Sequence, residues 1–168
     1  MAVEKSEKRS MPLPYAALVL AWLVPGAGHV YVGRLGRGVV IFVTVSALFW
    51  AGVGIGGVLT VDYYSERWWF AAEMLTGIHG LVGWYRQKAV YNRLPQMRGA
   101  SLDEKLKNAN LALVAPGETV ARAYAGVAGL LNLLCIFDAL MLSVMGVTGE
   151  QPPPRAPSGA AAAGRARP

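Results

Sequence analysis

Two stretches of the chain are apolar over a length that would cross a membrane. Residues 38–61 carry no charged side chain. At ~1.5 Å per residue, a helix over this stretch would be ~36 Å long, which exceeds the ~30 Å hydrocarbon core of a bilayer. Residues 123–147 are nearly as apolar and carry one charged side chain, Asp138. Both patterns predict membrane-spanning helices.

A third apolar run, residues 68–85, is shorter and contains Glu73 and His79. Aromatic pairs stand at its two ends, about one bilayer thickness apart. Amphipathic rings prefer the headgroup level, so this pattern predicts a spanning helix with two interface belts. The aromatic residues are Trp68, Trp69, Trp84 and Tyr85.

The first apolar run, residues 12–24, is short and is stopped by Pro25 and Gly26. Three interpretations compete. The run forms a half-helix or re-entrant segment, or a full span to Gly33 that is kinked at Pro25, or a signal peptide behind the basic leader. With the other runs it predicts an all-α integral membrane bundle of about four hydrophobic helices, the first short and broken at Pro25–Gly26.

The rest of the chain is polar or low in complexity. Residues 1–11 form a polar N-terminal tail, and residues 12–147 form a single helical membrane domain. A polar loop, residues 86–122, contains Ser101 and Glu104 at the spacing of a helix capping box, although a chance match in a solvated loop is an equal reading. The Pro- and Ala-rich residues 148–168 are expected to be a disordered tail.

Small residues recur on two of the long runs at helical spacing. Gly52 and Gly56 form a GxxxG pattern, and Ala121, Ala125 and Gly129 form a second stripe. Small residues let helix backbones approach closely. We expect both stripes to be helix-packing faces within the chain.

A glycine-rich hinge with one histidine and one tyrosine follows the first run. Backbone groups freed by a Pro–Gly break cannot face lipid, so they must be packed against protein or lie at the interface. We expect His29 and Tyr31 at the headgroup level, and Arg34 and Arg37 near lipid phosphates. The hinge residues are Pro25, Gly26, Gly28, His29, Tyr31, Gly33, Arg34, Arg37 and Gly38.

This hinge resembles the signature of the small two-transmembrane-helix hairpin domain family, in which glycines precede a histidine and a Tyr-x-Gly. His29 and Tyr31 lie one residue closer than in that family, so the resemblance is distant. Together with the run from Ala128 to Asp138, the hinge is more similar to an uncharacterised bacterial multi-pass membrane-protein family, a domain of unknown function. That resemblance implies a bacterial inner (plasma) membrane location and no particular activity.

Three ionisable side chains and one asparagine fall inside the apolar runs: Glu73, His79, Asp138 and Asn132. A charged residue near the bilayer centre costs ~2.5–3.5 kcal/mol on insertion scales, so each needs a partner or a role. Either the ionisable three line one polar cavity, or each is satisfied separately. By helical spacing we expect Glu73 to share a face with Gly77, Gly80 and Trp84.

Composition supports a membrane environment. The chain is 54% hydrophobic and only 15% charged, and a soluble domain of 168 residues could not bury so much apolar surface. Its net charge of +6 comes from residues between apolar runs, which indicates contact with the lipid bilayer and no nucleic acid. Cys135 is the single cysteine, and no pair of residues has metal-ligand spacing. No cofactor or metal is expected.

The distribution of cations bears on topology. If all four runs cross, the 16 Lys and Arg residues divide almost evenly, whereas most fall on one face if the first run enters and returns. Both arrangements place loop 86–122 in the cytoplasm. No catalytic motif stands out, so we expect a non-enzymatic scaffold or accessory subunit that forms a homo-oligomer or binds other membrane proteins. The alternative is a transporter or channel subunit that uses the intramembrane polar residues.

Overall fold

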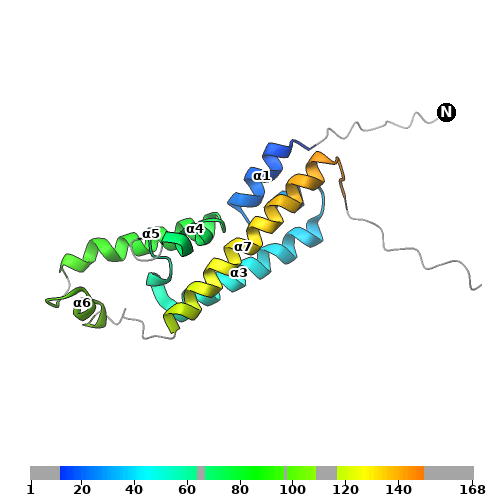
Figure 1. Cartoon of the computed structure of the whole chain (residues 1–168). Helices are drawn as coiled ribbons and strands as arrows, with labels where there is room; N and C mark the ends of the chain where they lie inside the picture. The colour runs from blue at the N-terminus through cyan, green and yellow to red at the C-terminus, as the bar shows by residue number, and fades with distance from the viewer. Residues whose placement is uncertain (1–11, 64–66, 97, 109–116, 150–168) are drawn as a thin grey trace, which may run out of the picture.

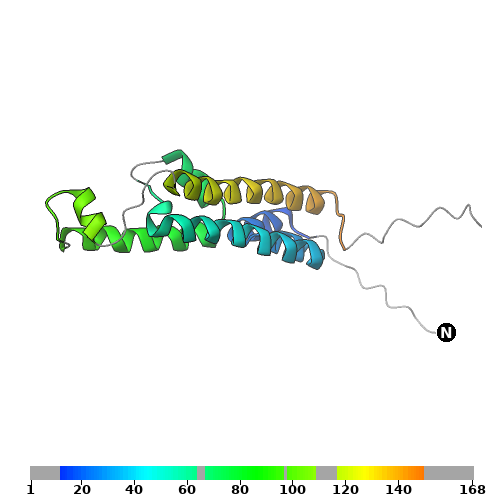
Figure 2. The same ribbon diagram turned by 90° about the horizontal axis from the view of Figure 1, so that it is seen from below.

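Two long helices form the centre of the molecule. The computed structural model describes residues 12–63, 67–96, 98–108 and 117–149, and every regular element in these ranges is a helix. The helices α3 (Leu35–Gly56) and α7 (Gly117–Val144) lie side by side along the molecule (Figures 1 and 2). Both are long and apolar enough to cross a membrane.

Small residues bring α3 and α7 into close contact. A Cβ atom at Gly52 would lie 2.6 Å from the carbonyl oxygen of Ala121, and Gly56 packs against the same alanine. Further along, Phe49 belongs to a buried cluster with Ala125. Because residue numbers rise on one helix as they fall on the other, the pair is antiparallel. The two small-residue stripes therefore pack within the chain, as predicted.

The helices α1 (Pro14–Leu23) and α2 (Ala27–Tyr31) form a hairpin at one end of this pair. The chain reverses at residues 24–26, where Gly26 has φ +83°, a conformation that side-chain-bearing residues rarely adopt. The backbone N–H of Leu13 donates to the hydroxyl of Tyr31 at 3.2 Å, so the outer ends of the hairpin meet. The break is where the sequence places it, and the chain returns instead of continuing as a kinked span.

A second hairpin replaces the single helix predicted over residues 68–85. It consists of α4 (Arg67–Met74) and α5 (Ile78–Arg93). After Met74 the backbone tightens into i→i−3 hydrogen bonds, the Thr76 hydroxyl donates to the carbonyl oxygen of Glu73 at 2.6 Å, and Gly77 has φ +64°. Glu73 and Gly80 therefore stand on different helices, and the expectation that they share one helix face is wrong.

Other boundaries also differ from the sequence prediction. Helix α3 ends at Gly56 and is followed by a 3₁₀ turn, η1 (Gly57–Thr60), because Gly57 takes a positive φ of 63°. The predicted loop 86–122 is largely helical. It contains the end of α5, then η2 (Leu94–Gln96), α6 (Leu102–Asn108) and the first turn of α7.

The capping box at α6 forms. The backbone N–H of Glu104 donates to the Ser101 hydroxyl at 3.2 Å, and the Glu104 carboxylate accepts from the Ala100 N–H at 2.9 Å. These bonds satisfy N–H groups that the start of a helix leaves without partners. The predicted tails lie mostly in residues 1–11 and 150–168, outside the described residues.

The two hairpins occupy opposite ends of the α3–α7 pair. At the α1–α2 end, the Ser143 hydroxyl donates to the carbonyl oxygen of Pro12 at 3.0 Å. At the α4–α5 end, the Gln87 amide donates to the Asp62 carboxylate at 2.6 Å. In Figure 1, α1 and the α4–α5 hairpin therefore follow one another along the central pair. The hairpin tips point toward the middle.

Candidate functional site

The tips of the two hairpins meet halfway along the molecule. The indole N–H of Trp22 donates to the carbonyl oxygen of Met74 at 3.3 Å. A Cβ atom at Gly77 would lie 2.6 Å from the carbonyl oxygen of Leu23 and would overlap that of Trp22. The last turn of α1 thus lies directly against the break between α4 and α5. We call this contact region, residues 21–23 with 73–77 and Asn132, the junction.

Asn132 of α7 connects both tips. Its side-chain amide donates to the carbonyl oxygen of Ala21 at 3.3 Å and to that of Leu75 at 2.8 Å, and the side chain is fully buried. The last carbonyl groups of a helix have no partner within that helix. Asn132 supplies a partner to one of them, at Ala21, and to the carbonyl group of Leu75 directly after α4, which explains an amide in an otherwise apolar segment.

Glu73 is the least explained side chain of the junction. It is fully buried, and neither carboxylate oxygen has a hydrogen-bond partner among the described residues. Two charged side chains, those of Arg122 and Asp62, interact electrostatically with it. A buried carboxylate without a hydrogen bond carries a large desolvation cost. Glu73 is therefore the candidate for a functional polar group.

His79, the second predicted polar group, has a partner that the sequence did not reveal. Its Nε2 atom lies 2.9 Å from the hydroxyl oxygen of Ser46 on α3. Aromatic rings surround the imidazole at centroid distances of 5.9–6.3 Å: those of Phe42, Phe49 and Trp50. The contact ties the start of α5 to the middle of α3.

Asp138 lies apart from Glu73 and His79, near the α1–α2 end. Its carboxylate is 2.8 Å from Nε2 of His29 and 3.4 Å from the guanidinium of Arg37. The Asp138 side chain is 50% exposed, while that of His29 is 1% exposed. Glu73, His79 and Asp138 therefore do not line one cavity.

The hinge residues build the α1–α2 hairpin and the start of α3. Pro25 and Gly28 are buried, and Gly38 packs against Val30. Arg37 is exposed, and Gly33 takes a positive φ of 85°. Two hinge residues that we expected at the membrane interface, His29 at the headgroup level and Arg34 near lipid phosphates, are buried instead. His29 turns inward to Asp138, and Arg34 is 6% exposed.

A cluster of polar side chains lies at the α4–α5 end. Asp62 accepts from Gln87 and lies 4.0 Å from Arg122, which in turn pairs with Glu118 at 2.5 Å. These residues come from the segment directly after η1, from α5 and from α7. They link the segment after η1 to α5 and to α7, close to the end of α3. Their separation in sequence hid the cluster from sequence analysis.

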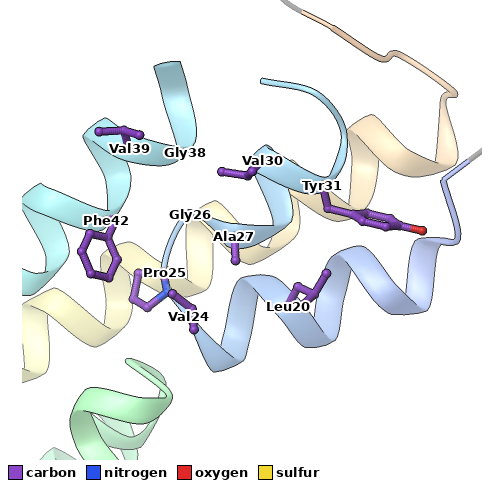
Figure 3. A pocket seen from close by; sticks show the side chains of 10 residues that line it. All are labelled: Leu20, Val24, Pro25, Gly26, Ala27, Val30, Tyr31, Gly38, Val39 and Phe42. Atoms are coloured by element: carbon purple, nitrogen blue, oxygen red, sulfur yellow. The ribbon is translucent and has the colours of Figure 1, made fainter. Parts of the chain in front are cut away.

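Two grooves flank the junction. One, of about 400 Å³, lies between α1, α2 and the start of α3, and side chains from all three helices line it (Figure 3). Its walls are almost entirely apolar, with Leu20, Val39 and Phe42 among them. The other, of about 350 Å³, lies between α4 and α5 and includes Lys88. Among the described residues no group of three or more His, Cys, Asp or Glu side chains could hold a metal ion.

Residues 16–152 match DUF6677, a family of unknown function. The chain belongs to DUF6677. The match begins in α1 and ends beyond α7, so the DUF6677 region includes both hairpins, the junction and the central helix pair. No curated protein and no solved structure matches the chain. For this DUF6677 chain, a functional argument therefore rests on the junction, the grooves and the outer surface.

Proposed function

We propose that the protein is an integral membrane protein in which α3 and α7 cross the bilayer. The support is their apolar character and the number of large apolar side chains that they turn outward. In water, apolar patches of this extent mark a surface that something else covers. At ~1.5 Å per residue α3 is ~33 Å long and α7 ~42 Å, enough for a ~30 Å hydrocarbon core.

We further propose that the two hairpins enter the bilayer from opposite faces and meet near its middle. At ~1.5 Å per residue α1 is ~15 Å long and α4 ~12 Å, so end to end they match one hydrocarbon thickness. Broken backbone at this depth is tolerated only where protein covers it and satisfies its polar groups. Asn132 supplies hydrogen bonds of this kind, since it binds carbonyl groups on both tips.

This proposed topology changes how the Lys and Arg residues divide between the two faces of the membrane. Both ends of the chain then belong to the face of Arg34 and Arg37, and the 16 Lys and Arg residues divide evenly between the faces. Arg165 and Arg167, however, lie beyond the roughly 15–20 residues from a helix end over which the positive-inside rule counts. We therefore propose that the α5–α6 face is cytoplasmic, in the plasma membrane of a bacterium.

Within that membrane we propose a non-enzymatic role as a scaffold or accessory subunit. The observation that carries it is a stripe of exposed side chains on α7, facing away from α3. Their spacing alternates between three and four residues, which is the a/d pattern of helices that pack along a seam. The stripe consists of Val127, Leu130, Leu134, Phe137, Met141 and Val144, each at least 43% exposed.

Site-specific photo-cross-linking in native membranes tests this role. A photoreactive phenylalanine analogue is placed at position 134 or 137 on the stripe, and at position 43 on α3 as a control that is equally exposed. We expect one reproducible protein adduct from 134 and 137 and none from 43. An adduct of about twice the 17.9 kDa chain mass identifies a homo-oligomer. The absence of protein adducts at 134 and 137, or equal adducts at 43, contradicts the proposal.

The burial of Glu73 favours a second candidate, a transporter or channel subunit. Ionisable groups inside a membrane domain are rare and often mark ion or proton paths. Transporters also place their sites where discontinuous helices meet near the bilayer midplane, as the hairpin tips do here. Flux in proteoliposomes is the test. If Glu73→Gln and Asp138→Asn leave proton and cation flux at the wild-type level, this candidate is excluded.

A further inference from the structure

The groove between α4 and α5 is apolar along most of its length and cationic at one end. Met74 and Leu81 lie at its inner end, near the junction, and Phe70 forms part of its wall. Lys88 lines its outer end beside Gln87, which is bonded to Asp62. From Leu81 to Lys88 the helix rises about 10 Å. The groove therefore changes from apolar to charged in the direction from the centre of the molecule outward.

In the described part of the chain, the ammonium group of Lys88 has no acidic partner. Among the described residues its recorded contact is with the ring of Trp84, whose centroid lies 5.5 Å from Nζ. No carboxylate in the described part of the chain lies within ion-pair distance of it. An anion at this position would meet the positive charge of Lys88 at the outer end of the apolar α4–α5 groove.

The other groove provides a contrast within the same molecule. It has a similar volume, about 400 Å³, and is lined by apolar residues, glycines and Tyr31, with no cation (Figure 3). The Tyr31 hydroxyl already accepts from the Leu13 N–H. Both grooves offer space for a hydrocarbon chain, but of the two only the α4–α5 groove pairs that space with a positive charge that has no acidic partner among the described residues.

We propose that the α4–α5 groove binds one anionic glycerophospholipid, with an acyl chain along Phe70, Met74 and Leu81 and the phosphate at Lys88. The proposal rests on the proposed membrane placement. In that placement Lys88 lies at the polar boundary of the bilayer and Leu81 lies deeper. Trp84, beside Lys88, is the residue type that favours the headgroup level. A lysine near an anionic lipid surface contributes about 1 kcal/mol, or about a fivefold preference over a zwitterionic lipid.

Native mass spectrometry of the full chain in detergent tests this site. The protein is titrated with phosphatidylglycerol or phosphatidylcholine that carry the same acyl chains. We expect the first phosphatidylglycerol to bind about fivefold more tightly than the first phosphatidylcholine. Lys88→Gln should bring the ratio to about one, and Lys88→Arg should keep it. The matched control is Lys107→Gln, which removes an exposed cation of α6 and should leave the ratio unchanged.

A second pair of variants tests the acyl-chain contact. Leu81→Trp fills the α4–α5 groove and should weaken the first phosphatidylglycerol at least threefold, while Leu20→Trp fills the other groove and should leave that affinity unchanged. Equal affinity for the two lipids in the wild type, or a lipid preference that survives Lys88→Gln, overturns the proposal. So does unchanged affinity in Leu81→Trp. Because binding is measured in detergent without any partner, failure here is distinct from failure of the scaffold role.

Discussion

The side-chain amide of Asn132 lies 2.8 Å from the carbonyl oxygen of Leu75, so a residue of the last helix closes the break in the second hairpin. The same amide reaches the carbonyl oxygen of Ala21 at 3.3 Å in the first hairpin. Two hairpins that lie at opposite ends of the α3–α7 pair are thus held together at their tips by one side chain. Asn132 is the position at which a single substitution affects both hairpins.

We predict that Asn132→Leu destabilises the fold by about 1–3 kcal/mol, because two carbonyl groups of the junction lose their partner while the branched shape of the side chain is kept. Reversible unfolding in detergent micelles, followed by circular dichroism, measures the change. Asn92→Leu, at an exposed position of α5, is the control and should change stability by less than about 0.5 kcal/mol. Equal stability of the two variants would show that the junction does not depend on Asn132.

The glycine at the second break combines two constraints that substitutions can separate. Gly77 has a positive φ of 64° and lies against the carbonyl groups of Trp22 and Leu23, whereas Gly57 has φ +63° with no atom in the way. We predict a loss of about 1–2 kcal/mol for Gly57→Ala, from backbone strain alone. Gly77→Ala should cost more, since the two hairpin tips must also separate.

Gly54→Ala completes this series. Gly54 lies within α3 and a Cβ atom there would meet nothing within 4 Å. Alanine is the better helix former by up to about 1 kcal/mol, so this variant should be neutral or stabilised. The same unfolding measurement ranks the three variants. A Gly77→Ala protein as stable as Gly57→Ala would mean that the tips are not in contact.

His29 and Asp138 should show measurable coupling, because their side chains are 2.8 Å apart and one of them is buried. We predict a coupling energy of about 0.5–1.5 kcal/mol in a double-mutant cycle of His29→Gln and Asp138→Asn, with the exposed half of Asp138 limiting the value. The control cycle pairs His79→Gln with Asp138→Asn. Ser46, the partner of His79, and Arg37, a partner of Asp138, are about 13 Å apart along α3. The effects of these two substitutions on stability should therefore add.

The sequence predicted those parts of the fold that depend on residues close together in the chain. The long apolar runs, the break at Pro25 and Gly26 and the α6 capping box each depend on residues close together in the chain. The break at residues 75–77 gave no such signal, because it contains no proline and Gly77 is unremarkable in an apolar helix. The hydropathy of a segment is the same whether the segment forms one straight helix or turns back as a hairpin.

The contacts of the candidate site were beyond local analysis for a different reason. His29 and Asp138 are 109 residues apart, and Asn132 and Ala21 are 111 apart. The sequence identified Glu73, His79, Asn132 and Asp138 as polar groups that require an explanation, but their partners depend on which helices meet. Ser46 and Gln87 gave no sign of their roles, since each is an ordinary polar residue until the fold places a histidine or an aspartate beside it.

The two-hairpin topology makes a prediction that a four-crossing bundle does not share. In the background Cys135→Ala, single cysteines replace Tyr15, Leu35, Trp68 or Lys88, all of which are exposed. Labelling of intact cells with a membrane-impermeant maleimide should give one result for positions 15 and 35 and the opposite result for positions 68 and 88. If residues 68–85 crossed the bilayer, 68 and 88 would differ from each other. A cysteine at Lys105 then fixes the orientation, since labelling from outside would place the α5–α6 face outside the cell and reverse the proposed topology.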